Sequence, residues 1–383
     1  MRSKALMCYV PAVRFKQGEY RGLGRLAADV ADRIAPRLVM PPPKDRDQEK
    51  GRRLTQDEIL HLTGRRIAQH WGMREAFLEP RFLFAEFGET ESVNWLPRLF
   101  KVARDASAVL IPVATLNDLL GARSQAFKLV LANDMETRIA LRVQSGEIDR
   151  HLAGRVTAVM DRLDVIPPEC ALLLDFADAD LTNVDAVASV ISSTLEEVQG
   201  IGRWQSIIFQ GTNYPDKNPA AENSSVSVPR NEWLAWSKTI KDDPNSSASL
   251  LFGDYAADNA NFEFRSGGGA APYRYYRYCL TDRWTVVRGS QDVAQAEAMR
   301  EVCQTILDSG YFAGPDFSSA DEFIYQTAKG YAGPGNATTW REINTAHHIT
   351  QVVSDIGRMR GFSVGRRVVA VSPRQESLFG PEA

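Results

Sequence analysis

Ala171-Leu172-Leu173-Leu174-Asp175-Phe176 is the stretch from which the fold can be argued. The run is nearly continuous in apolar residues, as a strand buried on both faces of a parallel sheet should be. Ile148–Leu163 before it and Val184–Gln199 after it place apolar residues at helical spacing with polar residues between them. The sequence therefore predicts a buried strand with a helix on either side.

The same alternation of strand and helix extends through Tyr255. The expected strands are Leu6–Val13, Arg37–Met40, Phe82–Phe87, Ala108–Val113, Arg138–Val143, Ala171–Phe176, Ser206–Gln210 and Ser249–Gly253. The expected helices are Glu19–Ile34, Thr55–Trp71, Asn94–Asp105, Ile148–Leu163, Val184–Gln199 and Asn231–Lys241. Eight strands alternating with helices predict an α/β fold, a TIM-like (β/α)₈ barrel over residues 1–270. A doubly wound open sheet is the alternative, because alternation does not establish closure.

The alternation of strands and helices ends after Pro272. Residues 273–287 read as a β-hairpin, and helices are expected at Val293–Asp308, Ser319–Lys329 and Thr339–Met359. We expect an α-rich appendage over residues 271–365 and a flexible, extended tail over residues 366–383. Within the hairpin, strand alternation places Tyr273, Tyr275 and Arg277 on one face, where aromatic packing is favoured over stacking on bases.

Polar loops interrupt the alternation at three places. They are 41–53, rich in proline and charge, 213–229, long and polar, and the triple glycine at 267–269. All three follow expected strands, so they should emerge at the carboxyl-end face, where barrel proteins build their sites.

Composition limits the range of functions. The chain has 383 residues, a hydrophobic share of 44% and a formal net charge of −3, so no global basic field indicates nucleic-acid binding, and contact with DNA would be local or indirect. Four widely separated cysteines show no metal-binding spacing. No run of 18 apolar residues occurs and Met1–Lys4 opens no signal peptide, so a cytoplasmic protein without membrane contact is expected.

Charged residues near the ends of the expected strands are the candidates for chemistry. They are Arg14 and Lys16, Glu86, Arg142, Asp175 and Asp178, and Asp254 with Tyr255. Carboxylates beside Arg and Lys could act as acid, base and anion clamp, or bind a divalent metal. The alternative is a ring of ion pairs that satisfies buried charges. Glu86 and Asp175 stand out, because both interrupt apolar runs where an unpaired charge is costly.

His347-His348 is the one pair of adjacent histidines in the sequence. Neighbouring positions on a helix point about 100° apart, so both cannot easily hold one metal ion. His348 is kept as a catalytic candidate, with packing as the alternative. The sequence contains no Gly-x-Ser-x-Gly, Walker loop, His-Glu-x-x-His or Cys-x-x-Cys, so nucleophilic Ser or Cys chemistry has no support.

Gln375-Glu376-Ser377-Leu378-Phe379 resembles the peptide by which bacterial replication and repair proteins bind the DNA polymerase sliding clamp. The resemblance implies polar contacts for the Gln375 amide and an apolar pocket of the clamp for Leu378 and Phe379, with Ser377 also among the partner-binding residues. A tail that packs on its own domain would use the same residues.

Tyr9-Val10-Pro11, Lys16 and Gly18-Glu19 at the expected first strand and helix resemble the opening of the phage-associated beta family proteins. Leu141-Arg142, Leu174-Asp175 and His347-His348 fit the same pattern. The resemblance implies roles for Lys16, Glu19, Arg142, Asp175 and His348, and an association with phage defence or mobile elements.

Three functions remain open from the sequence. The leading hypothesis is an interaction protein recruited to the sliding clamp through its tail. The second is a barrel hydrolase that acts on a phosphate-bearing or nucleotide substrate with strand-end carboxylates. The third is a scaffold or inhibitory subunit without catalysis, whose tail packs on its own surface; a neighbouring gene could encode a partner protein.

Overall fold

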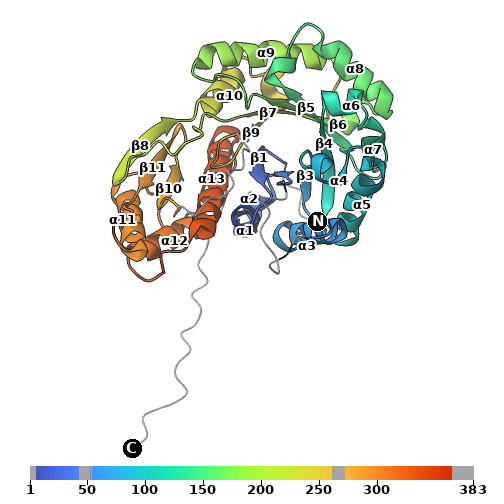
Figure 1. Cartoon of the computed structure of the whole chain (residues 1–383). Helices are drawn as coiled ribbons and strands as arrows, with labels where there is room; N and C mark the ends of the chain where they lie inside the picture. The colour runs from blue at the N-terminus through green and yellow to red at the C-terminus, as the bar shows by residue number, and fades with distance from the viewer. Residues whose placement is uncertain (1–5, 43–51, 53, 261–271, 365–383) are drawn as a thin grey trace, which may run out of the picture.

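The computed structural model describes residues 6–42, 52, 54–260 and 272–364. Its central sheet is a closed barrel of parallel strands in the order β1-β2-β3-β4-β5-β6-β7-β9 (Figure 1). These strands are β1 (Tyr9–Arg14), β2 (Arg37–Val39), β3 (Glu75–Glu79), β4 (Val109–Thr115), β5 (Ile139–Gln144), β6 (Cys170–Asp175), β7 (Ser206–Gly211) and β9 (Leu250–Asp254). Pairing of β9 with β1 closes the barrel. The expected TIM-like barrel is therefore confirmed, and the open sheet is excluded.

Helices follow the strands and cover the outside of the barrel (Figure 1). They are α1 (Gln17–Gly24), α2 (Ala28–Ala31), α3 (Gln56–Trp71), α4 (Leu83–Phe87), α5 (Ser92–Asp105), α6 (Leu116–Leu120), α7 (Ser124–Lys128), α8 (Leu152–Leu163), α9 (Val184–Ile201) and α10 (Asn231–Asp242). Thr55 and Glu58 form a capping box that starts α3, and the Asn183 side chain caps α9. In the described part of the chain, no helix has both the length and the apolar composition needed to cross a membrane.

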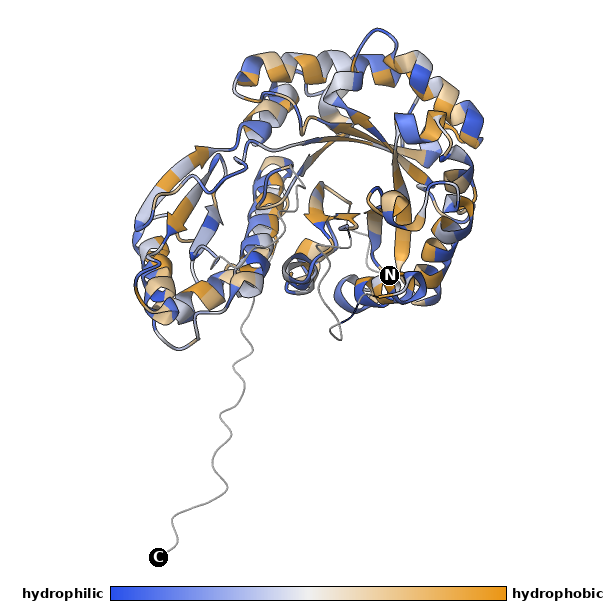
Figure 2. Cartoon of the chain, viewed as in Figure 1, coloured by the Kyte–Doolittle hydropathy of each residue, from blue (hydrophilic) through white to orange (hydrophobic). Residues whose placement is uncertain are grey.

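The strands are apolar on both faces, which Figure 2 shows as mostly hydrophobic colouring of the barrel. Side chains that face outward join the core beneath the helices, among them Leu38, Leu172 and Leu174. Inward-facing side chains such as Val10 and Leu173 fill the barrel interior with a separate apolar cluster. The barrel is thus a packed core, and the carboxylates of Glu79, Asp175 and Asp254 stand at the carboxyl ends of their strands.

The third strand differs from the sequence prediction. Phe82–Phe87, expected as a strand, forms helix α4, while the strand is Glu75–Glu79. The Phe84 ring packs against Trp95 at 4.9 Å between ring centroids, so the apolar run covers the barrel wall as one helical turn. A short apolar run does not by itself distinguish a strand from a helix. Glu86 consequently lies on α4, partly exposed, and not at a strand end.

The appendage contains a three-stranded antiparallel sheet and three helices. The sheet has the order β10-β11-β8, with β8 (Ser224–Pro229), β10 (Tyr275–Cys279) and β11 (Arg283–Arg288). The helices are α11 (Gln295–Asp308), α12 (Ser319–Ala328) and α13 (Ala337–Arg360). Strand β8 lies inside the stretch 213–229 that was expected to be a polar loop, which corrects that prediction. Its residue Val228 is buried beside Trp284 of β11, whereas Ser225 and Ser227 on the opposite face are exposed.

Helix α13 is held against α1 by two glycines one turn apart. A Cβ added at Gly18 would lie 2.8 Å from Arg341 Cβ, and one added at Gly22 would lie 2.8 Å from Thr345 Cβ. The two helix backbones can therefore approach closely only because these positions lack side chains. This contact places α13 beside the carboxyl end of β1, where Figure 1 shows it running alongside α1 and α2.

Candidate functional site

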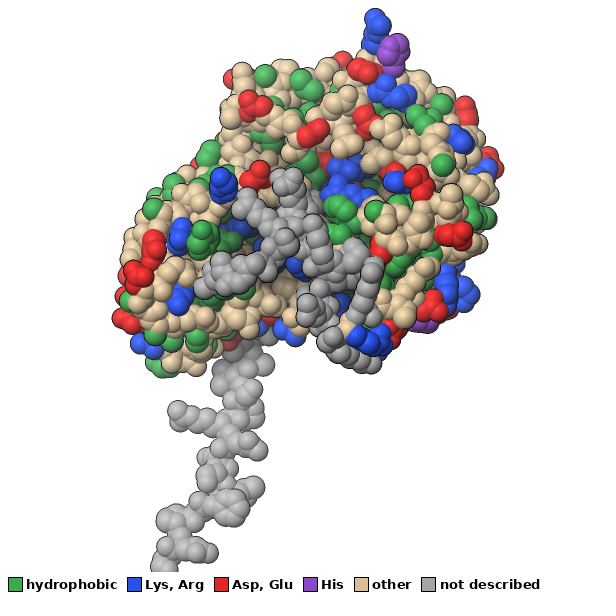
Figure 3. Space-filling model, viewed as in Figure 1, with side chains coloured by type: hydrophobic (Ala, Val, Ile, Leu, Met, Phe, Trp, Pro, Cys, Tyr) green, Lys and Arg blue, Asp and Glu red, His purple; other side chains and the backbone are tan. Residues whose placement is uncertain are grey.

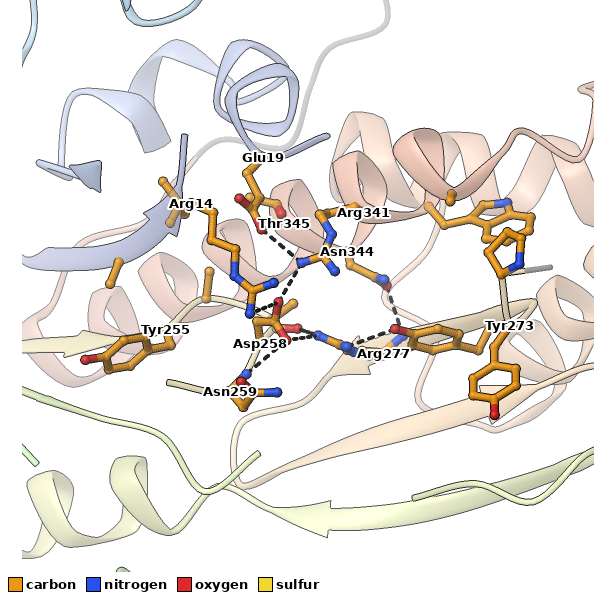
Figure 4. Close-up of a pocket in the computed structure, with 18 residues that line it drawn as sticks. Arg14, Glu19, Tyr255, Asp258, Asn259, Tyr273, Arg277, Arg341, Asn344 and Thr345 are labelled. Atoms are coloured by element: carbon orange, nitrogen blue, oxygen red, sulfur yellow. Dashed lines mark hydrogen bonds and ion pairs between the residues drawn. The ribbon is translucent and has the colours of Figure 1, made fainter. Parts of the chain in front are cut away.

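A pocket of about 270 Å³ opens between the carboxyl ends of β1 and β9, strand β10 and helix α13 (Figure 4). We call it the mouth pocket. The charged side chains that line it are Arg14 at the end of β1, Glu19 on α1, Asp258 after β9, Arg277 on β10 and Arg341 on α13. The pocket thus combines barrel and appendage residues at the face where barrel proteins bind ligands.

Asp258 holds the three arginines of the mouth pocket together. Its Oδ2 lies 3.3 Å from Nη2 of Arg14 and 2.5 Å from Nη1 of Arg341, while its Oδ1 lies 2.9 Å from Nη1 of Arg277. Burial alone would raise the pKa of Asp258, but Arg14, Arg277 and Arg341 hold it well below its usual range. The carboxylate is therefore charged, and it fixes three guanidinium groups around one point.

Glu19 is the second carboxylate of the mouth pocket and is 4% exposed. Its Oε1 accepts a hydrogen bond of 2.9 Å from Nη1 of Arg341. Its Oε2 is buried and has no hydrogen-bond partner among the described residues. Burial raises the pKa of Glu19, although Arg341 and Arg14 act against this shift.

Aromatic rings form the remaining wall of the pocket. Tyr255, Tyr273, Tyr275 and Trp340 line it, and the first two of these come from opposite sides in Figure 4. Nη2 of Arg277 donates to the Tyr275 hydroxyl at 2.8 Å, and its guanidinium lies 4.4 Å from the centre of the Tyr214 ring. Three arginines face two carboxylates, so the pocket carries a surplus positive charge beside flat rings.

A second group of charged residues lies inside the barrel, and we call it the barrel ion network. Arg37 Nη1 lies 3.0 Å from Asp175 Oδ2, and Arg37 Nε lies 3.1 Å from Glu79 Oε2. Arg142 Nε lies 2.7 Å from Asp175 Oδ2 and its Nη1 lies 3.4 Å from Glu79 Oε1. Burial favours protonation of Asp175, yet Arg142 and Arg37 hold its pKa below the usual range. On the face shown in Figure 3, basic side chains gather in a hollow over the barrel.

Tyr255 connects the two groups. Its hydroxyl donates to Asp175 at 2.8 Å and accepts from Nη2 of Arg37 at 3.1 Å, while its ring lines the mouth pocket. The barrel ion network therefore lies directly behind Tyr255, on the barrel side of the mouth pocket.

A third group ties α13 to the barrel. Asp254 at the end of β9 accepts hydrogen bonds from the Tyr9 hydroxyl and from His348 Nε2, the latter at 2.8 Å. Nη2 of Arg230 lies 3.4 Å from Asp254 Oδ2, and Trp284 Nε1 donates to His348 Nδ1 at 3.3 Å. All five side chains are fully buried.

The structure brings some of the predicted site residues together and separates others. Arg142 and Asp175 meet in the barrel ion network, and Asp254 meets His348 beneath α13. Lys16 precedes α1 and is not among the residues that line the mouth pocket, and Glu86 lies on α4. Gln375, Ser377, Leu378 and Phe379 lie outside the described residues, as do the glycines at 267–269.

Several central residues were not candidates from the sequence: Arg37, Glu79, Arg230, Asp258, Arg277 and Arg341. Glu79 was not identified because strand β3, which ends at this residue, was not predicted from the sequence. For Arg341 a signal exists, because Arg341, Thr345 and His348 recur at helical spacing and share one face of α13. Within residues 6–42, 52, 54–260 and 272–364, no group of three or more His, Cys, Asp or Glu side chains could hold a metal ion.

The closed parallel barrel, with a charged pocket at its carboxyl-end face, defines a protein of the TIM-barrel class. Within that class, the chain belongs to the Beta protein family, whose sequence profile matches residues 9–354. The family resemblance seen in the sequence is therefore confirmed.

Two solved structures are similar to the chain at low identity. One is a "putative lyase/mutase" from Burkholderia cenocepacia, with 12% identity, a TM-score of 0.33 and coverage of 65% of this chain and 76% of that chain. The other is the carboxyl transferase domain of Rhizobium etli pyruvate carboxylase with pyruvate, with 9% identity, a TM-score of 0.32 and coverage of 68% of this chain and 42% of that chain. A search of curated proteins gave no match.

Proposed function

We propose that the protein binds a small phosphate-bearing ligand of the nucleotide type in the mouth pocket. The observation that carries this proposal is the set of three arginines, Arg14, Arg277 and Arg341, which Asp258 holds around an open cavity. Guanidinium groups offer paired donors that match phosphate oxygens, and groups already fixed in place lose little entropy on binding.

The aromatic wall supports a ligand with a flat ring. Tyr273 is 51% exposed and lines the pocket together with Tyr275, so a ring face is accessible next to the arginines. Any of the nucleobases can stack on such a side chain, because every base has a flat aromatic face. A phosphate held by arginines and a base against tyrosine is the arrangement that a nucleotide would complete.

The surroundings of the carboxylates that the sequence singled out favour a ligand-binding function over a hydrolase function. Asp175 and Asp254 are fully buried, and their oxygens accept hydrogen bonds from arginine, tyrosine and histidine side chains. Carboxylates engaged in this way support the barrel and do not extend into the mouth pocket.

Calorimetric titration of the full chain with adenosine 5′-monophosphate (AMP) and with inorganic phosphate tests the proposal. Arg341→Met removes one partly exposed guanidinium and should weaken AMP binding about tenfold, because a hydrogen bond to a charged group is lost. Arg25→Met is the matched control: both arginines are 34% exposed and both bridge α1 and α13, but Arg25 does not line the pocket. Equal affinity in Arg341→Met and wild type, or no binding of either probe, overturns the proposal.

Recruitment to the DNA polymerase sliding clamp is a second candidate function, carried by the sequence Gln375–Phe379. A short extended peptide with Leu378 and Phe379 as apolar anchors fits a pocket on a partner. A role in anti-phage defence or mobile-element biology would follow if the protein acts at replication forks.

Purified clamp provides the test of this second candidate. The double variant Leu378→Ala, Phe379→Ala should lose clamp binding in calorimetry, whereas the control Val368→Ala, Val369→Ala in the same segment should keep it. Binding that survives the first double variant excludes the peptide as the docking element.

A further inference from the structure

We infer that Glu19 selects the ligand of the mouth pocket by accepting a hydrogen bond from it. The ligand class is thereby narrowed to phosphate-bearing molecules that also carry an N–H or O–H donor within reach of Glu19. The inference rests on the proposed ligand-binding function and adds a specificity-determining residue to it.

The unpartnered oxygen of Glu19 is the first observation. Oε1 is engaged by Arg341 at 2.9 Å, but Oε2 has no hydrogen-bond partner among the described residues although the residue is only 4% exposed. Glu19 lines the mouth pocket, and its carboxylate sits beside Thr345 and Arg341 in Figure 4. Buried polar atoms of folded proteins almost always have a partner, so this oxygen calls for a donor from the pocket.

The second observation is that Glu19 cannot easily move to find a partner elsewhere. The neighbouring Gly18 lies so close to α13 that an added Cβ would be 2.9 Å from the Thr338 carbonyl oxygen. Gly22, one turn later, makes the same approach to the Glu342 carbonyl at 2.9 Å. The backbone of α1 is therefore fixed on α13 on both sides of Glu19, and the carboxylate is fixed with it.

The charges around Glu19 determine what kind of donor fits. A carboxylate accepts hydrogen bonds and donates none. Arg341 already bridges Glu19 and Asp258 through one nitrogen, and Arg14 contacts the same oxygen of Asp258 as Arg341 does. Because two cations are already in place, Glu19 does not need a third cation. A neutral amino or hydroxyl group of the ligand completes its coordination while the phosphate faces the arginines.

Calorimetry with matched nucleotides tests the inference on the full chain. AMP is compared with inosine 5′-monophosphate, which replaces the exocyclic amine by a carbonyl, and with 2′-deoxy-AMP, which lacks one ribose hydroxyl. Wild type should bind AMP about tenfold more tightly than at least one of these two analogues. Glu19→Gln, which presents an amide in place of the free oxygen, should abolish that preference.

Glu342→Gln is the matched control, because Glu342 is a largely buried carboxylate on the same helix pair, bonded to Arg25 and outside the pocket. It should keep the preference of wild type. If wild type binds AMP and both analogues equally, the inference about Glu19 is wrong while the proposed function stands. If neither AMP nor inorganic phosphate binds wild type, both fail. A preference that persists in a folded Glu19→Gln protein also overturns the inference.

Discussion

His348 Nε2 on α13 lies 2.8 Å from Asp254 Oδ2 at the end of β9. The partner of the other ring nitrogen fixes the protonation state: Trp284 Nε1 can only donate, so His348 Nδ1 must accept and the proton resides on Nε2. Burial lowers the pKa of His348, in agreement with a neutral imidazole. A neutral side chain thus bonds the helix that carries Arg341 to the barrel, and the mouth pocket is formed before any ligand arrives.

Asp254→Asn should destabilise the protein by about 3 kcal/mol, because it removes one of the two carboxylates that pair with the buried Arg230 guanidinium, leaving only Glu232, and disturbs the bonds to Tyr9 and His348. Urea unfolding measures the change. Asp242→Asn removes an exposed partner of Lys238 and should cost no more than about 0.5 kcal/mol. Similar losses of unfolding free energy in the two variants would show that the buried cluster around Asp254 contributes no more to stability than an exposed ion pair.

The pKa values of the neighbouring His347 and His348 should be shifted in opposite directions. His347 contacts the Asp321 carboxylate at 3.1 Å and the Cys279 carbonyl at 2.9 Å, both acceptors, so both ring nitrogens must donate. Burial favours the neutral form, but Asp321 and the Cys279 carbonyl raise the pKa of His347 overall. NMR should show His347 losing its proton above pH ~6.5 and His348 gaining one below pH ~6.5, the unfolded value.

The linkage to stability has opposite signs for these two residues. The contribution of His347 is fully present below the unfolded pKa and is lost as pH rises through its raised folded pKa. For His348, whose folded pKa is lowered, stability falls as pH drops below the unfolded pKa. In concentrated urea both resonances should titrate near pH ~6.5. The reverse order in the folded protein would contradict the bonding described here.

The barrel could be predicted because buried parallel strands are continuous apolar runs, but its closure could not. The bond between Tyr9 and Asp254 joins residues 245 positions apart, and no local period reports such a contact. Strand β3 was missed for a physical reason. Its last residue, Glu79, points into the barrel ion network, so Glu75–Glu79 has fewer apolar residues than the helix that follows it.

The mouth pocket was only partly accessible from sequence. Alternation correctly grouped Tyr273, Tyr275 and Arg277 on one face, and all three line the pocket. Their use was not predictable, because Arg277 and Arg341 both reach Asp258 only through packing of the appendage on the barrel. Arg142, Asp175 and Asp254 were singled out as charged residues near the ends of expected strands, and His348 as one of a histidine pair. Neither signal distinguishes a residue that supports the fold from one that contacts a ligand.

Gly22→Ala should destabilise the protein by about 1–3 kcal/mol through overpacking, because the new Cβ would lie 2.8 Å from Thr345 Cβ and 2.9 Å from the Glu342 carbonyl oxygen. Displacement of α13 should also weaken AMP binding. Gly154→Ala on α8 meets nothing within 4 Å and should stabilise by about 0.5–1 kcal/mol. Thermal unfolding and calorimetry of both variants make the comparison, and equal effects would exclude close packing of α1 on α13.

Glu19→Gln should leave the ligand-free protein more stable than wild type at neutral pH. Burial raises the pKa of Glu19, so the folded state disfavours its charged form and the ionised residue costs stability at any pH above its folded pKa. The amide keeps an acceptor for Arg341 without that charge. As pH falls through the folded pKa, wild-type Glu19 takes up a proton and the advantage of the variant should shrink. Urea unfolding at several pH values between about 4 and 8 measures it, against the unfolded reference near 4.3. A variant that is less stable than wild type throughout would mean that the charged carboxylate supports the fold, and Glu19 would then be a structural partner of Arg341 and not a residue held ready for a ligand.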